Sequence, residues 1–365
     1  MNEASLAAKQ KMLKSQLMQR TRQTLVSLIL EETGHSIQKL TRRHQTPSSL
    51  FSALLIASLV LLIDILVSFF HGEFRSSARG GFVPIEILMA GAICALLITL
   101  KKYFDSLFSI IRERIIDNIQ DVTSLIDLQT WLDKVWDTKR TLLFGTFCMV
   151  VGFSYFFIPI VIFGEPASSL FGAFIMGAVL FFIAGIALYY FYRILILPLH
   201  LSQYSFRIYD LDPRNSEIIE NISNLITTFG YIVAAFMAVT TATLVLIGWT
   251  ALPAMAPTIL TAWVLIIALF VTNHYALNKI ITKAKWKTLN EIQKQIKQMY
   301  TAGNLTEKEK IESINRLMDY HDRIKGTPNS ALDFRAVLSF VNSLLLPLLA
   351  FLLSNMKGLI GLVHK

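Results

Sequence analysis

Seven long apolar segments divide this chain of 365 residues, and they constrain its fold more than any other feature. A helix needs roughly 20 apolar residues to cross a bilayer, and each segment is near or above that length. The runs are too long, and alternate too little, to be strands of a membrane barrel. The sequence therefore predicts an all-α polytopic membrane protein with six to seven transmembrane helices, over residues 50–70, 82–100, 142–163, 170–197, 229–252, 258–276 and 336–355.

Composition supports this prediction and excludes several other classes of protein. Hydrophobic residues make up 54% of the chain and charged residues only 16%, whereas a soluble domain carries about 25% charged residues. The net charge of +9 does not indicate a simple DNA-binding protein, because such proteins combine it with a polar surface. Cys94 and Cys148 lie inside apolar runs and are expected to pack there, which excludes a disulfide-built secreted domain. No secretory signal peptide is expected.

The basic residues predict the orientation of the chain in the membrane. With a cytoplasmic N-terminus, 30 of the 34 Lys and Arg residues fall inside and four outside. Basic residues accumulate on the cytoplasmic side of membrane proteins, so an integral protein of the inner (plasma) membrane is expected. Pro347 lies in the middle of the seventh apolar segment, so this segment either spans the membrane or re-enters it.

This orientation divides the chain into membrane segments and cytoplasmic parts. The first two spans, the third and fourth, and the fifth and sixth form pairs over 50–100, 141–197 and 229–276. Residues 101–140 continue the helical period of the second span. A capping box at 306–309 predicts a helix that ends near Gly326. The remaining cytoplasmic parts are a basic arm (1–49), a connector (198–228) and a basic helical subdomain (277–335); the last segment and tail cover 336–365.

Two acidic residues stand out inside the predicted spans. Asp64 lies about six residues before the outer end of the first span, and Glu86 about four residues into the second, so the two share a similar depth. Ionisable residues inside the membrane are functional candidates by default. Around an oligomer they would ring an outer vestibule and attract cations. Alternatively, each is simply hydrogen-bonded or reaches the interface.

Polar side chains follow one face of two other segments. Such faces either line water or allow helices to approach closely. The residues considered as pore-lining candidates are Thr228, Tyr231 and Thr241 in the fifth segment and Ser339, Asn342 and Ser343 in the seventh.

Two stretches contain more lysine and arginine residues than the orientation of the chain in the membrane requires. Residues 277–300 carry Lys279, Lys283, Lys285, Lys287, Lys294 and Lys297 around Trp286. These lysines either meet anionic lipid headgroups or bind an anionic ligand, with Trp286 as a stacking platform. The N-terminal arm predicts a basic amphipathic helix on the inner surface, with a plug or a contact for an anionic ligand as alternatives. Its candidate ligand-binding residues, between positions 9 and 22, are Lys9, Lys11, Lys14, Arg20 and Arg22.

Enzyme motifs are missing from the sequence. It contains no Walker A glycine loop, HExxH, GxSxG or Cys/His metal pattern, so no enzyme, cofactor or metal is expected. We instead expect an oligomeric ion channel, gated from the cytoplasmic side by an anionic ligand. A secondary transporter would need a substrate site near the midplane, and Asp64 lies far from it. A lipid-modifying enzyme would need clustered catalytic polar residues at one interface, and a structural or sensor partner is a further alternative.

The layout of the chain resembles the membrane effectors of bacterial anti-phage systems, in particular the Hailong channel effectors. The resemblance rests on the basic arm over 9–22, the multi-span body and the lysine-rich stretch NKIITKAKWK at 278–287, and it extends over most of the chain. It implies a tetrameric, nucleotide-regulated channel of the bacterial inner membrane that acts in antiviral defence. Such a channel is held closed by a plug and by a deoxyadenylate oligomer, and it opens upon infection to depolarise the cell.

Overall fold

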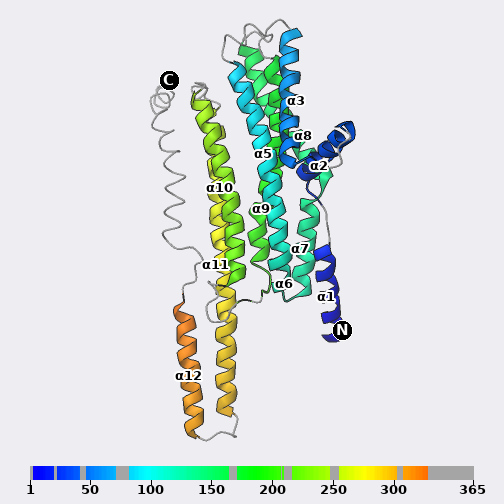
Figure 1. Ribbon diagram of the computed structural model, residues 1–365. Helices are drawn as coiled ribbons and strands as arrows, with labels where there is room; N and C mark the ends of the chain where they lie inside the picture. The colour runs from blue at the N-terminus through cyan, green and yellow to red at the C-terminus, as the bar shows by residue number, and fades with distance from the viewer. Residues whose placement is uncertain are drawn as a thin grey trace, which may run out of the picture. The chain divides into compact units, whose positions relative to one another are not determined.

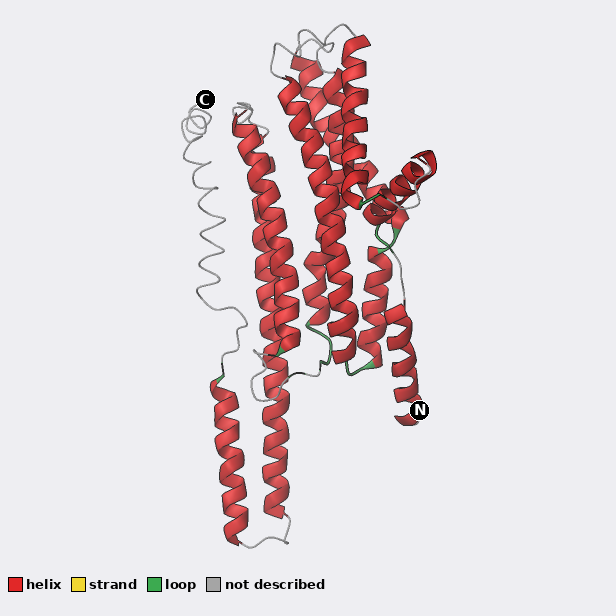
Figure 2. Cartoon of the chain, in the orientation of Figure 1, coloured by secondary structure: helices red, strands yellow, loops and turns green. Residues whose placement is uncertain are grey.

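The protein is helical throughout the residues that the structure, a computed structural model, describes (Figure 2). These residues are 3–19, 23–41, 47–70, 82–163, 171–206, 208, 216–246, 255–301 and 307–327. Within them no strand is present, and the only β pairing is an isolated antiparallel bridge between Ile119 and Phe206. The predicted all-α fold is therefore confirmed for this part of the chain.

Three helices of the described part are long and apolar enough to cross a membrane. Their membrane-compatible stretches are Ser49–Val67, Glu86–Asn118 and Ile175–Leu201. They coincide with the first, second and fourth predicted spans. The predicted count of seven stays a prediction, because the seventh segment, with Ser339, Asn342 and Ser343, lies outside the described residues.

The chain divides into two compact units, and the boundary falls within α1, α7 and α9. One unit comprises residues 15–109 and 128–194, and we call it the apolar unit. It contains α2 (Leu25–Thr41), α3 (Ser49–Phe70), α8 (Thr138–Phe163), nearly all of α5 (Phe82–Ile110), and parts of α1 (Glu3–Gln19), α7 (Val122–Val135) and α9 (Phe171–Leu201).

Aromatic side chains pack together in part of the core of the apolar unit. Phe104 and Tyr190 are fully buried, and their ring centroids lie 4.5 Å apart. The Tyr190 hydroxyl accepts a hydrogen bond from the backbone N–H of Leu25 at 3.0 Å, which joins the start of α2 to α9. Buried tyrosines keep a polar partner in this way, so the ring can pack without an unsatisfied hydroxyl.

Small residues set the distance between α8 and α9. A Cβ atom added at Gly185 would lie 2.6 Å from the Cβ of Cys148 and 3.0 Å from the Cα of Gly145. The two backbones therefore approach more closely than larger residues allow, as is common where membrane helices pack.

The outward surface of the apolar unit is apolar along α3 and α8. Exposed residues of α3 include Leu54, Leu62 and Phe69, and those of α8 include Leu143 and Phe147. A soluble monomer rarely exposes contiguous apolar surface on this scale. These faces are therefore suited to hydrocarbon rather than to water.

The second unit comprises residues 1–14, 110–127 and 195–365, of which only part is described. We call it the basic unit. Its long helices are α10 (Glu217–Leu246), α11 (Met255–Thr301) and α12 (Glu307–Gly326). Helix α11 packs against α10 in its first part and against α12 in its last part (Figure 1). Leu289, Ile292 and Ile324 form a small core between α11 and α12.

The predicted continuous helical period over 101–140 is interrupted in the structure. Helix α5 passes into a wider turn, η1 (Ile111–Ile115), and then α6 (Ile116–Asn118). Ile119 is extended, with φ −77° and ψ 127°. Asp121 then caps α7 by accepting the backbone N–H of Ser124 at 2.8 Å. An Asp in this position starts a new helix. The helix that continues from the second span therefore ends before Asp121, although the apolar spacing continues.

Candidate functional site

The structure brings Asp64 and Glu86 together inside the apolar unit. Asp64 is fully buried, at 0% exposure, and Glu86 is 8% exposed. They come from α3 and α5, and the carboxyl group of each interacts with that of the other. The backbone of Met176 on α9 also interacts with the Asp64 carboxyl. Neither Asp64 oxygen has a hydrogen-bond partner of good geometry in the described part of the chain.

This carboxyl pair is costly in its surroundings. The flanking segments of α3 and α5 are apolar, and a buried charge is tolerated only when it is paired or neutralised. Two adjacent negative charges repel each other, and a proton held between them or a bound cation removes that repulsion. Among the described residues no group of three or more His, Cys, Asp or Glu could hold a metal ion.

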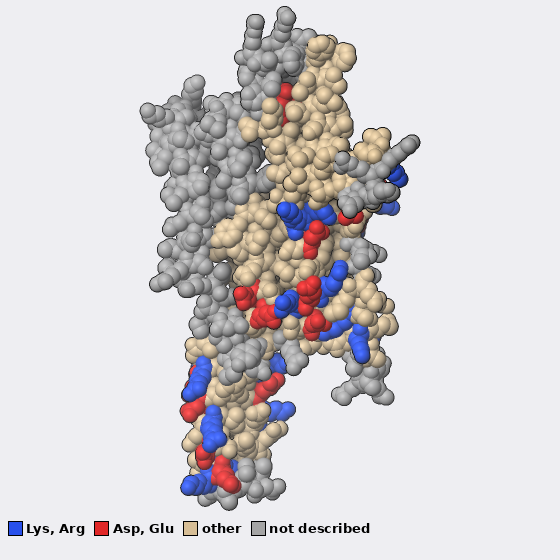
Figure 3. Space-filling model, viewed as in Figure 1, with Lys and Arg blue, Asp and Glu red and all other residues tan. Residues whose placement is uncertain are grey.

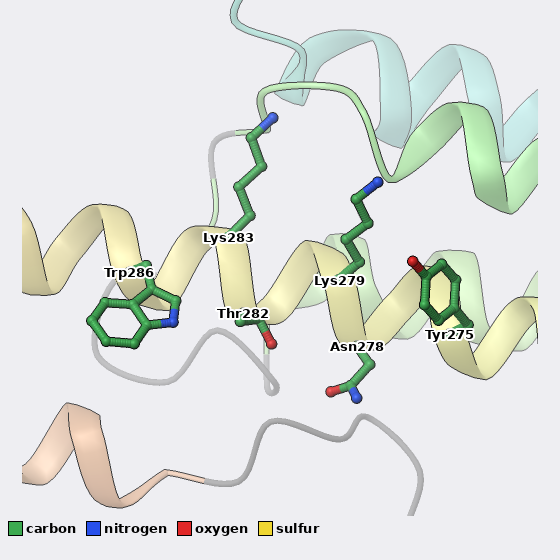
Figure 4. Close-up of a pocket in the computed structure, with 6 residues that line it drawn as sticks. All are labelled: Tyr275, Asn278, Lys279, Thr282, Lys283 and Trp286. Carbon is green, nitrogen blue, oxygen red and sulfur yellow. The ribbon is translucent and has the colours of Figure 1, made fainter.

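The second candidate site lies on α11, in the basic unit. Six side chains of one helix face line a shallow pocket, and Figure 4 shows Lys279 and Lys283 pointing to the same side of the helix. The lining includes two lysines and no acid. Trp286 is 59% exposed and Tyr275 60% exposed. The lining residues are Tyr275, Asn278, Lys279, Thr282, Lys283 and Trp286.

The structure assigns different environments to the predicted lysines of α11. Lys285 is buried and donates to the carbonyl oxygens of Lys325 at 2.8 Å and Thr327 at 2.7 Å, so it holds the end of α12. Lys287 donates to the side chain of Gln120 at 3.5 Å. Lys294 and Lys297 are exposed. Figure 3 shows acidic residues interspersed among the lysines over the last part of α11 and α12, so this part of the face is not uniformly basic.

Lys283 connects the pocket to the segment that follows α9. Its ammonium group donates to the carbonyl oxygens of Gln203 at 3.0 Å and Tyr204 at 3.5 Å. An ammonium group has three N–H donors, so one remains for a ligand.

A polar cluster borders this segment within the basic unit. The Tyr204 hydroxyl donates to the Asp127 carboxylate at 2.7 Å, and His200 lies 2.8 Å from the same oxygen. Burial, together with the Asp127 carboxylate, raises the pKa of Tyr204 well above its ordinary value. The cluster holds the segment after α9 in place and is structural.

The start of the N-terminal arm forms α1, and its residues up to Lys14 belong to the basic unit. Lys9 and Lys11 are exposed, whereas Lys14 donates to the carbonyl oxygen of Asp117 at 2.8 Å. Burial lowers the pKa of Lys14, and the nearby Asp117 carboxylate partly opposes this. Arg20 and Arg22 lie outside the described residues.

The predicted polar face of the fifth segment is exposed on α10. Thr228 is exposed and Tyr231 is 50% exposed. The backbone of Thr241 is helical, but its side chain lies outside the described part. Whether these residues face water stays a prediction.

Four residues of the two sites did not stand out in the sequence. Tyr275 precedes Lys279, Asn278 precedes Thr282 and Thr282 precedes Trp286 by four positions each, and that helical spacing is the signal that would have found them. Met176 contacts Asp64 through its backbone, so no side-chain pattern reveals it.

Comparisons with known proteins give no match. No protein-family model matches this chain, and no curated protein or solved structure matches it either.

Proposed function

We propose that this protein is an oligomeric ion channel that conducts cations and is gated from the cytoplasm by an anionic ligand. The observation that carries the proposal is the carboxyl pair of Asp64 and Glu86 between two apolar helices. Acidic side chains persist inside a membrane where they interact with an ion that passes or binds.

The basic residues support the second half of the proposal. In the proposed orientation the N-terminus, the last part of α11 and α12 lie in the cytoplasm of a bacterial cell, at its inner membrane. The lysines of α11 and of the arm would then meet an anionic ligand on that side. Binding changes the gate only if the ligand prefers one state over the other.

The resemblance to anti-phage channel effectors extends this proposal. A tetramer closed by a deoxyadenylate oligomer, and opened on infection, would depolarise the cell in antiviral defence. A membrane-potential dye in infected cells tests it. Loss of potential that depends on this protein is expected, and an unchanged potential would contradict it.

A cation-coupled secondary transporter is the second candidate. The complete burial of Asp64 favours it, because a carboxyl pair closed off from water can exchange a proton for a cation without a leak. A lipid-modifying enzyme is a further candidate.

Ion flux into liposomes containing the purified protein tests the proposal. Asp64→Asn and Glu86→Gln should each lower cation flux about tenfold, the factor that corresponds to ~1.4 kcal/mol of lost interaction. Asp105→Asn is the matched control, because Asp105 is exposed on α5 and pairs with Lys101.

Each outcome of the flux experiment separates the candidates. Flux that grows linearly with the gradient and falls in both variants supports a channel. Saturable exchange of one solute for protons supports the transporter instead. Absence of flux with and without an added anionic ligand would refute both.

A further inference from the structure

One face of α11 changes from apolar to basic along its length, and the whole face is exposed. Its apolar part contains Val264, Ile267 and Val271, and Tyr275 follows at the same helical spacing. Lys279, Lys283 and Trp286 continue the face at steps of three and four residues. Side chains at this spacing lie above one another on one side of a helix, so the apolar part leads directly into the lysine pocket.

The length of the apolar part matches one leaflet of a bilayer. Val264 and Tyr275 are separated by about 16 Å along the axis, at 1.5 Å per residue. The hydrocarbon region of one leaflet is about 15 Å thick. Lys279 lies about 6 Å beyond Tyr275, which is the depth of the lipid phosphates. Tyr275 lies just before this level, at the interface that tyrosines favour.

The chemistry of the pocket suits a phosphate group. Lys279 has an exposed ammonium group and Lys283 retains one N–H donor beyond its two carbonyl partners. Figure 4 shows the Thr282 hydroxyl on the other side of the helix from these two ammonium groups, and no acid lines the pocket to repel an anion. A single molecule that combines a phosphate with an acyl chain therefore fits the entire face.

We propose that α11 binds an anionic phospholipid, with its phosphate at Lys279 and Lys283 and an acyl chain along Val271, Ile267 and Val264. This inference rests on the proposed function in one respect, namely that the first part of α11 lies in the bilayer. It identifies an anionic membrane lipid as a ligand of the basic face, on the cytoplasmic leaflet.

Fluorescence quenching by brominated lipids tests the site in the full-length protein. The protein is reconstituted in phosphatidylcholine vesicles that contain either brominated phosphatidylglycerol or brominated phosphatidylcholine at the same mole fraction. The chain has five tryptophans, so the difference between Tyr275→Trp and wild type isolates the signal of a tryptophan at the end of the apolar part. Phosphatidylglycerol is expected to quench this signal more strongly than phosphatidylcholine.

Lys279→Gln is the decisive variant, because Lys279 is exposed and makes no hydrogen bond or ion pair with the residues that the structure describes. It should lower the preference for phosphatidylglycerol about fivefold, which is the effect of one lysine near an anionic surface. Lys283→Gln should act in the same direction, although it also loses contacts with the segment after α9. Lys308→Gln on α12 is the matched control and should leave the preference unchanged.

Several results would overturn the inference. Equal quenching by the two lipids, or an unchanged preference in Lys279→Gln, would show that the face does not select anionic lipid. Reversal of the quenching by a single-stranded oligonucleotide would assign the lysines to a soluble polyanion instead. The ion flux is measured on the same samples. Lipid preference without flux refutes the channel alone, and flux without lipid preference refutes this inference alone.

Discussion

Individual side chains in this protein differ in role more than their residue types suggest. Asp64 and Asp121 are both aspartates, yet one lies fully buried beside Glu86 and the other caps a helix. Among the lysines of α11, Lys285 is buried against the end of α12 while Lys279 is exposed at a pocket. The surroundings of each side chain therefore decide its chemistry.

Asp121 provides a prediction about pH. Partial burial raises the pKa of Asp121, but hydrogen bonds from Thr123, Ser124 and Ser205 outweigh this, so the pKa lies below its ordinary value. A lowered pKa in the folded state stabilises the protein above the unfolded pKa, and this contribution is lost as the pH falls through the folded value. Asp121→Ala should cost about 1 kcal/mol at neutral pH.

The melting temperature in detergent, followed against pH, measures this contribution. The difference between wild type and Asp121→Ala should be constant above about pH 5 and shrink at lower pH. Asp121→Asn, which keeps an acceptor oxygen for the cap, should lose less stability than Asp121→Ala. A difference that grows on acidification would contradict this explanation.

At the scale of elements, two kinds of contact hold helices together: the close approach of two backbones, and side-chain contacts at the end of a helix. Helices α8 and α9 meet at Gly145 and Gly185, whereas α12 is held to α11 by Lys285 and by the small core around Ile324. The contact between α8 and α9 depends on the absence of side chains at the two glycines. The contact between α11 and α12 depends on the buried ammonium group of Lys285 together with apolar packing.

Gly185→Ala should lower stability by about 1–3 kcal/mol, the usual cost of overpacking. Its Cβ would lie 2.6 Å from the Cβ of Cys148, an atom next to the backbone that cannot move aside alone. Gly177→Ala on the same helix is the control, because nothing lies within 4 Å of its added Cβ. This control should keep or raise the melting temperature, and equal losses in the two variants would be inconsistent with a close helix contact.

Lys285→Met should loosen α12. The substitution removes two hydrogen bonds to carbonyl groups at the C-terminal end of α12, where a positive charge is also favourable. Amide hydrogen exchange over residues 307–327 should accelerate about tenfold, equivalent to ~1.4 kcal/mol. Lys294→Met, at an exposed position of α11, should leave the exchange unchanged. Protection of α12 that survives Lys285→Met would show that the apolar core alone holds this helix.

At the scale of the whole molecule, apolar surface and basic residues are separated along the chain. Exposed apolar side chains dominate α3 and α8, and most basic residues lie in segments predicted to be cytoplasmic. We therefore expect a single orientation in the membrane, with the basic arm and the last part of α11 on the inner side.

Labelling of introduced cysteines in intact cells tests this orientation. In a chain with Cys94 and Cys148 replaced by alanine, a thiol reagent that cannot cross membranes should not label Lys9→Cys or Lys294→Cys until the cells are permeabilised. Arg75→Cys, in a predicted external connection, should be labelled in intact cells. Labelling of Lys9→Cys from outside would reverse the proposed orientation.

The sequence by itself determined the helical class, three of the spans and several helix ends. Runs of apolar residues and capping signals are local, so the capping box at 306–309 and Gly326 predicted α12 within about a residue of its observed bounds. The interruption after Asn118 was missed, because the apolar period continues past Asp121, whose cap is completed by Thr123 and Ser124 and, from far along the chain, by Ser205.

Only the tertiary structure decided which side chains meet. Similar depth suggested that Asp64 and Glu86 belong to one level of the membrane, but their direct interaction depends on how α3, α5 and α9 pack. Likewise, nothing in the lysine spacing of α11 distinguishes the buried Lys285 from the exposed Lys279. Helical periodicity determines which residues lie on the same face of a helix. What packs against that face is determined by contacts between segments far apart in the sequence.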